Sequence, residues 1–155
     1  MKVAVIGAGV MGPGIVQSWM LNGDTVALND IREEALAESK IKIEENINLM
    51  YEKKIIDKNA EAYMHLLETT TSLEEAVKDA KLVIEAIAEK PEIKEDLYNK
   101  LDKLCPEDTV IVSNTSAMPL PDMFPNFRPE NFFICHYFNP PEIMPLVEIV
   151  KSERT

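Results

Sequence analysis

The chain has 155 residues, of which 46% are apolar, and a formal net charge of −11. This length suits one domain with a sizeable core, and the negative charge argues against a nucleic-acid-binding surface, so any anionic ligand must be held by local features. The two cysteines, Cys105 and Cys135, are too few and too scattered for a disulfide framework or a metal site, and we expect free thiols.

The sequence lacks the signals of membrane insertion and of secretion. No apolar run approaches the ~20 residues of a membrane span. Met1 and Lys2 lead directly into an apolar strand pattern, without the charged region, apolar core and cleavage site of a secretory signal. We therefore expect a cytoplasmic protein that does not contact a membrane.

Apolar segments alternate with helical patterns along the chain. Predicted buried strands cover residues 3–6, 25–28, 82–84, 110–112, 132–135 and 146–150, and predicted helices lie near residues 10–22, 32–54, 73–79 and 91–104. Continuous apolar strands are typical of a parallel sheet covered on both faces. The alternation predicts right-handed crossovers and an α/β fold of the Rossmann type, doubly wound around a mainly parallel sheet.

A glycine motif, GAGVMG at residues 7–12, follows the first predicted strand and opens a helix. This context is the one a dinucleotide fingerprint requires. Gly7 permits the tight turn, Gly9 lets the backbone approach a pyrophosphate, and Gly12 allows close packing of helix and strand. The helix N-terminus offers N–H donors to the phosphates. We expect cofactor contacts from Gly7, Gly9, Val10, Met11 and Gly12.

Asp30 ends the second predicted strand, 21 residues after Gly9. A carboxylate at this point accepts hydrogen bonds from the adenosine ribose and repels a 2′-phosphate, which favours NAD over NADP. Arg32 offers a phosphate partner nearby, but a residue in the first helical turn is the simpler interpretation. We also expect Asp30 to cap the second helix, Ser72 to cap the third, and Pro91 to lie in the first turn of the fourth.

One helical region is longer than a simple crossover requires. The pattern that starts at Arg32 runs past Lys53, and residues 57–67 predict a second helix before the sheet resumes. Its apolar stripe is interrupted by charged residues. The region is either a long solvated hairpin or an arm that contacts a ligand or partner, and the pattern leaves both open.

An imidazole and a carboxylate, His136 and Glu148, lie on two strand-like segments joined by a proline-rich turn. Oxidation of a secondary alcohol requires removal of its O–H proton while hydride leaves the carbon for a nicotinamide. An imidazole titrates near neutrality and accepts such a proton, and a carboxylate on its other N–H fixes the tautomer. The pair therefore predicts a general base with an orienting partner.

Several blocks beyond the glycine motif and Asp30 carry a family resemblance. They are SKIKIEE at residues 39–45, EAIAE at 85–89, SNTS at 113–116 and HYFNPPEIMPLVE at 136–148. Over nearly all 155 residues, the chain resembles the NAD-binding domain of the L-3-hydroxyacyl-CoA dehydrogenases, which include 3-hydroxybutyryl-CoA dehydrogenase. The resemblance implies oxidation of (S)-3-hydroxyacyl-CoA to 3-ketoacyl-CoA with NAD, a reaction of fatty-acid β-oxidation.

The resemblance also implies roles for individual residues. His136 is the general base, Glu148 orients it, and Ser116 binds the substrate oxygen near the nicotinamide. The long helical region resembles the family's coenzyme A arm, with Lys53 at a CoA-binding position and Asn46 where many members have Ser. Further NAD contacts are implied for Glu89 and Lys94.

The family pattern continues beyond the last residue of this chain. We therefore expect residues 1–155 to be an NAD-binding domain that is incomplete at its C-terminal end, without the family's helical substrate and dimerisation domain. We expect weak or absent activity from this truncated domain alone, an acyl-CoA substrate, and a homo-oligomer in the full-length enzyme.

Two alternatives remain open. An L-gulonate 3-dehydrogenase-like sugar-acid oxidoreductase shares the fold and the His–Glu chemistry. Residues 139–141 and 144–148 favour that group, whereas Phe138 and Lys53 favour acyl-CoA. The second alternative is a noncatalytic nucleotide-binding or assembly module.

Overall fold

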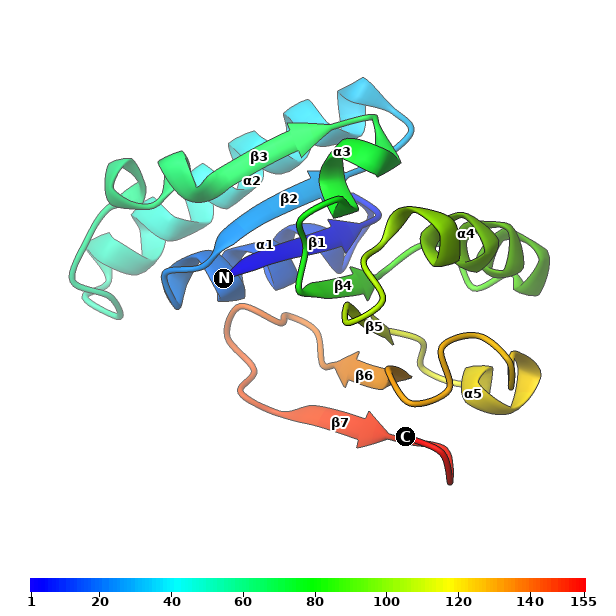
Figure 1. Ribbon diagram of the computed structural model, residues 1–155. Helices are drawn as coiled ribbons and strands as arrows, with labels where there is room; N and C mark the ends of the chain where they lie inside the picture. Colours follow the sequence, from blue (N-terminus) through cyan, green and yellow to red (C-terminus); the bar gives the residue numbers. More distant parts are fainter.

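The structure, a computed structural model, describes all residues from Met1 to Thr155 and contains one seven-stranded sheet (Figure 1). The strands are β1 (Lys2–Ile6), β2 (Thr25–Asn29), β3 (Leu67–Thr70), β4 (Leu82–Glu85), β5 (Val110–Ser113), β6 (Phe132–Tyr137) and β7 (Val147–Val150). Their order in the sheet is β3-β2-β1-β4-β5-β6-β7. All neighbouring pairs are parallel except β6 and β7, which are antiparallel. The predicted doubly wound, mainly parallel α/β fold is confirmed.

Helices cover both faces of the sheet (Figure 1). One core layer lies between the sheet and the first two helices, and a second layer lies between the sheet and the last three. The helices are α1 (Gly12–Leu21), α2 (Glu33–Glu52), α3 (Leu73–Val77), α4 (Pro91–Leu104) and α5 (Leu120–Met123), with 3-10 turns η1 (Ala60–Ala62) and η2 (Met64–Leu66). None of the helices combines the length and the apolar character that crossing a membrane requires.

The prediction of a second arm helix over residues 57–67 is wrong. Lys54, at a φ of 58°, ends the long helix α2 in a left-handed conformation. The following segment forms only the 3-10 turns, and the Asn48 side chain accepts a hydrogen bond from the N–H of Ala60 at 3.0 Å. Strand β3 then pairs with β2. The sequence did not predict β3, because this strand lies at the edge of the sheet and has the exposed polar residues Glu68 and Thr69 where a buried strand would have apolar ones.

The three predictions about helix starts have different outcomes. The Ser72 side chain accepts a hydrogen bond from the N–H of Glu75 at 3.3 Å, and Pro91 is the first residue of α4, so both predictions are confirmed. The predicted cap by Asp30 is wrong. Helix α2 begins at Glu33 with Arg32 at the N-cap position, which leaves Asp30 two residues too early.

Candidate functional site

The predicted site residues gather at the edge of the sheet where the parallel strands have their carboxyl ends. Loops that leave these ends form the crevice in which open α/β sheets bind ligands. The glycine loop follows β1, Asp30 follows β2, Glu89 follows β4 and Ser116 follows β5, while His136 lies one residue from the end of β6. The fold therefore brings segments from the whole chain to one edge.

The three glycines of the fingerprint have different surroundings. Gly7 adopts a φ of 110°, and a Cβ atom there would overlap the carbonyl group of Ala86. A Cβ atom on Gly12 would overlap the carbonyl oxygen of Gly7, so the loop and α1 pack against each other without room for a side chain. No atom lies within 4 Å of the corresponding position on Gly9. Gly9 therefore leaves open space beside the backbone, and the approach of a pyrophosphate there stays a prediction.

A hollow of about 430 Å³ extends from the glycine loop to the end of β2. Asp30 lines it, and one carboxylate oxygen, Oδ2, accepts a hydrogen bond from the N–H of Ala8 at 2.8 Å. The other oxygen, Oδ1, accepts one from the N–H of Arg32 at 3.0 Å. The exposed side chains of Ile31 and Ile93 also border the hollow. The hollow thus combines a fixed carboxylate with apolar walls, as adenosine binding requires.

A second hollow, of about 340 Å³, is lined by the glycine loop and by the loops after β4 and β5. Its lining includes Val10, Met11, Glu89, Asn114 and Ser116. A dinucleotide binds across the crevice of such a sheet with its pyrophosphate at the helix N-terminus. Occupation of this second hollow by the nicotinamide half stays a prediction. The loops after β4 and β5 supply its polar groups.

His136 and Glu148 stand opposite each other in the antiparallel pair β6–β7. The Nδ1 atom of His136 lies 2.9 Å from Oε2 of Glu148. A carboxylate only accepts hydrogen bonds, so in the neutral ring this contact places the proton on Nδ1 and leaves the lone pair on Nε2. The ring of Phe138 packs against the imidazole with its centroid 5.0 Å away. The geometry is that of an oriented base, and the catalytic role of both residues stays a prediction.

Glu89 organises the loop that carries Ser116. Its carboxylate accepts hydrogen bonds from the Thr115 hydroxyl at 2.9 Å and from the N–H of Ser116 at 3.1 Å. The preceding Asn114 side chain accepts a hydrogen bond from the N–H of Tyr137 at 2.8 Å. The Ser116 loop is thereby tied to β6 directly beside His136.

Lys94 has a different environment from the one expected for a cofactor contact. Its side chain is 1% exposed, and its ammonium group lies 2.7 Å from Glu85 and 3.6 Å from Glu89. Glu85 is a buried carboxylate that the sequence did not single out. Glu89, whose side chain is 47% exposed, is the member of this group that faces the solvent. NAD contacts by Glu89 and Lys94 stay predictions.

The two arm residues expected to bind substrate lie along α2. The Asn46 side chain donates a hydrogen bond to Glu142, in the β6–β7 loop, at 3.4 Å, so the arm reaches the loop between His136 and Glu148. Lys53 is exposed at the C-terminal end of the helix. Substrate contacts by Asn46 and Lys53 stay predictions.

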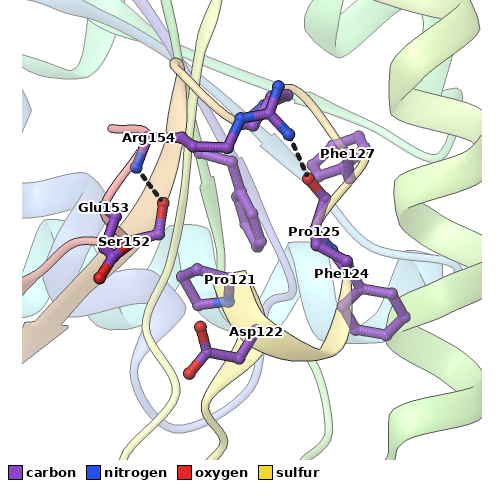
Figure 2. A pocket seen from close by; sticks show the side chains of 10 residues that line it. Pro121, Asp122, Phe124, Pro125, Phe127, Ser152, Glu153 and Arg154 are labelled. Carbon is purple, nitrogen blue, oxygen red and sulfur yellow. Dashed lines mark hydrogen bonds between the residues drawn. The ribbon is translucent and has the colours of Figure 1, made fainter.

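A further hollow, of about 290 Å³, contains none of the predicted site residues (Figure 2). It lies between α5 and the C-terminal segment and is lined by aromatic and proline side chains with Arg154 at its edge. Arg154 donates a hydrogen bond to the carbonyl oxygen of Pro125 at 3.3 Å. This hollow is separate from the crevice at the carboxyl ends of the strands.

Comparisons with known proteins agree over the whole chain. The family described as 3-hydroxyacyl-CoA dehydrogenase, NAD binding domain, matches residues 2–155. Mitochondrial hydroxyacyl-coenzyme A dehydrogenase from Mus musculus is 38% identical over 160 residues, 99% of this chain and 51% of that protein. 3-hydroxybutyryl-CoA dehydrogenase from Clostridioides difficile is 36% identical over 158 residues, 100% of this chain and 56% of that protein.

A solved structure gives the same result. The crystal structure of 3-hydroxybutyryl-CoA dehydrogenase from Escherichia coli K12 superposes with a TM-score of 0.92 at 34% identity, covering 100% of this chain and 33% of that chain. The chain spans about half the length of the curated relatives that it matches.

Proposed function

Because the chain belongs to the 3-hydroxyacyl-CoA dehydrogenase family, as its NAD-binding domain, we propose that it contributes the dinucleotide site and the general base to the oxidation of (S)-3-hydroxyacyl-CoA to 3-ketoacyl-CoA. The observation that carries this proposal is the 2.9 Å contact between His136 and Glu148. This pair lies at the same edge of the sheet as the glycine loop, which follows β1. An oriented imidazole beside a dinucleotide crevice supplies what alcohol oxidation needs.

The reaction divides between the cofactor and the chain's own residues. NAD, when bound, supplies the hydride acceptor. The Nε2 atom of His136 takes the hydroxyl proton, and the Glu148 carboxylate stabilises the imidazolium that results. The Ser116 hydroxyl donates a hydrogen bond to the substrate oxygen on which charge develops. The alcohol thereby loses one hydride and one proton and becomes a ketone.

The acyl-CoA substrate requires a local positive group, because the net charge of −11 repels the CoA phosphates. Lys53, with Lys54 beside it, supplies such a group at the end of the arm. Asn46 lies about two turns earlier on the same helix and supplies a side-chain amide.

We further propose that the full-length protein is a homo-oligomer, which light scattering tests. A cytoplasmic location is likewise a proposal; the names of the mammalian relatives assign those proteins to mitochondria, and cell fractionation distinguishes the two.

Calorimetry with NAD and a turnover assay together test the proposal. We expect NAD binding by the 155-residue chain and slow reduction of acetoacetyl-CoA by NADH that His136→Ala abolishes. His65→Ala is the matched control, because it removes the only other histidine, which is exposed in η2. Absence of NAD binding by folded protein would sink the proposal. Turnover of a sugar acid alone would support the L-gulonate alternative, and binding without His136-dependent turnover would support a nucleotide-binding module.

A further inference from the structure

Glu85, at the carboxyl end of β4, is a fully buried carboxylate with four hydrogen-bond donors. They are the Lys94 ammonium at 2.7 Å, the Tyr98 hydroxyl at 2.8 Å, the Ser113 hydroxyl at 2.5 Å and the N–H of Ile87 at 2.9 Å. A buried carboxylate is costly unless it is paired and hydrogen-bonded, and here donors from the loop after β4, from α4 and from β5 satisfy it. Such a concentration of donors holds the carboxylate in one orientation.

Lys94 connects this buried group to the surface of the site. Its ammonium group is the direct partner of Glu85 and lies 3.6 Å from a carboxylate oxygen of Glu89. Glu89 in turn accepts the hydrogen bonds of the Thr115 hydroxyl and of the Ser116 N–H. Two successive charged contacts and one hydrogen bond therefore connect Glu85 to the N–H of Ser116.

The backbone of Glu85 makes a second connection. Its carbonyl oxygen accepts a hydrogen bond from the N–H of Asn114 at 2.8 Å. The Asn114 side chain accepts a hydrogen bond from the N–H of Tyr137, next to His136. Glu85 is thus connected by hydrogen bonds both to the loop that carries Ser116 and, through Asn114, to the strand that carries His136.

Tyr98 fixes Glu85 from the opposite side. Its ring stacks on Phe127 with a centroid distance of 4.9 Å and meets Phe124 edge-on at 5.3 Å. The side chains of both phenylalanines are visible beside the hollow in Figure 2. Burial, reinforced by the negative charge of Glu85, raises the pKa of the Tyr98 hydroxyl well above its usual range. The hydroxyl consequently stays protonated and donates to Glu85 at every physiological pH.

We propose that Glu85 is a positioning residue for the nicotinamide side of the site, that Tyr98 holds it in place, and that both act on Ser116 through Lys94 and Glu89. This inference rests on the proposed function, because it assigns the Glu89–Ser116 edge to the nicotinamide. It assigns no contact with substrate or cofactor to Glu85 or Tyr98. Their effect is to fix the direction in which Glu89 and Ser116 face the second hollow.

The variant Tyr98→Phe tests the proposal, since it removes one donor to Glu85 and keeps the ring in the aromatic cluster. Phe127→Leu is the matched control, because it disturbs the same cluster without a contact to Glu85. Binding is measured with NAD⁺ and with ADP-ribose, which lacks the nicotinamide. We expect Tyr98→Phe to weaken NAD⁺ binding about 3- to 10-fold, the worth of one hydrogen bond, and to change ADP-ribose binding less than about twofold.

A merely structural role for Tyr98 predicts other results. Equal weakening of NAD⁺ and ADP-ribose binding, unchanged NAD⁺ binding, or the same selective loss in Phe127→Leu would each overturn the proposal.

Amide NMR of the unliganded chain separately tests the relay, that is, the contacts from Tyr98 and Glu85 through Lys94 and Glu89 to Ser116. The Ser116 N–H signal should move upfield in Tyr98→Phe and stay in place in Phe127→Leu, and an unmoved signal would also overturn the proposal. If the wild-type chain binds neither ligand, the proposed function fails while this signal still decides the relay.

Discussion

The Oδ2 atom of Asp30 accepts a hydrogen bond from the N–H of Ala8 at 2.8 Å, so the residue that follows β2 also holds the glycine loop that follows β1. The two segments are 22 residues apart in sequence and adjacent in the sheet. If Asp30 binds the adenosine ribose as predicted, the same carboxylate also fixes the loop predicted to receive the pyrophosphate. Substitution of Asp30 should then weaken the binding of both the ribose and the pyrophosphate.

Asp30→Ala should weaken NAD⁺ binding about 10- to 100-fold, since it removes a charge-assisted bond to the ribose and the bond to Ala8. Asp96→Ala is the control, because Asp96 borders the same hollow but pairs only with Lys100 at the surface. Calorimetry with NAD⁺ and NADP⁺ measures both effects. With Arg32 still present, NADP⁺ should bind to the Asp30 variant at least as well as to the wild type. An NAD⁺ affinity that the substitution leaves intact would contradict this role for Asp30.

Alanine at Gly9 should weaken cofactor binding, whereas alanine at Gly12 should destabilise the fold. Gly9→Ala meets no protein atom within 4 Å, so stability should change by less than about 0.5 kcal/mol while NAD⁺ affinity falls at least about tenfold. Gly12→Ala forces a Cβ atom against the Gly7 carbonyl, and overpacking of this kind costs about 1–3 kcal/mol. Urea unfolding and calorimetry on both variants separate the two cases. Comparable losses of stability in the two variants would refute this assignment of roles.

Cys105 should react slowly with thiol reagents in the folded chain. Burial raises the pKa of its thiol to about 11, so at pH 8 only about one molecule in a thousand carries the reactive thiolate. The labelling rate should therefore rise about tenfold per pH unit up to that value. A Cys135→Ala background leaves Cys105 as the single thiol, and labelling in urea supplies the unprotected rate. Fast labelling of the folded protein at pH 8 would exclude the buried position.

The fold and the family could be predicted because their signals are local in sequence. A glycine turn after an apolar strand depends on a few adjacent residues, and the alternation of strands and helices fixes the topology. The family assignment is confirmed. Strand β3 could not be predicted, since at the edge of the sheet its exposed Glu68 and Thr69 break the apolar pattern that identifies the other strands. Residues 57–67, which lead into it, instead predict a second arm helix.

The burial of Lys94 could have been predicted from the helical periodicity of α4. The buried positions of α4 are Lys94, Leu97, Tyr98 and Leu101, which follow the i, i+3, i+4, i+7 spacing of a helix face. That spacing places Lys94 on the apolar stripe, where an ammonium group needs a buried partner. The identity of the partner, Glu85, depends on how α4 packs on β4. Sequence periodicity contains no information on that packing.

Glu148→Gln should distinguish two roles of Glu148, which are to orient the His136 ring and to stabilise its protonated form. The glutamine oxygen can still accept the bond from Nδ1, but the neutral amide no longer stabilises the imidazolium formed when Nε2 takes a proton. We expect turnover to fall about 10- to 100-fold, the range for loss of acid–base assistance, with NAD⁺ affinity within about twofold of the wild type. Glu130→Gln, an exposed carboxylate without a hydrogen-bond partner in the structure, is the matched control.

Nitrogen NMR of His136 provides a measurement for Glu148 that is independent of turnover. With the Nδ1 atom 2.9 Å from Glu148, the neutral ring should carry its proton on Nδ1, the less common tautomer of a free imidazole. Glu148→Ala should shift the ring toward the Nε2–H form, whereas Glu148→Gln should retain Nδ1–H. Only two histidines exist, so His65→Ala assigns the signals. If the tautomer is the same in wild type and Glu148→Ala, the carboxylate does not orient this ring, and His136 must be positioned by its packing against Phe138.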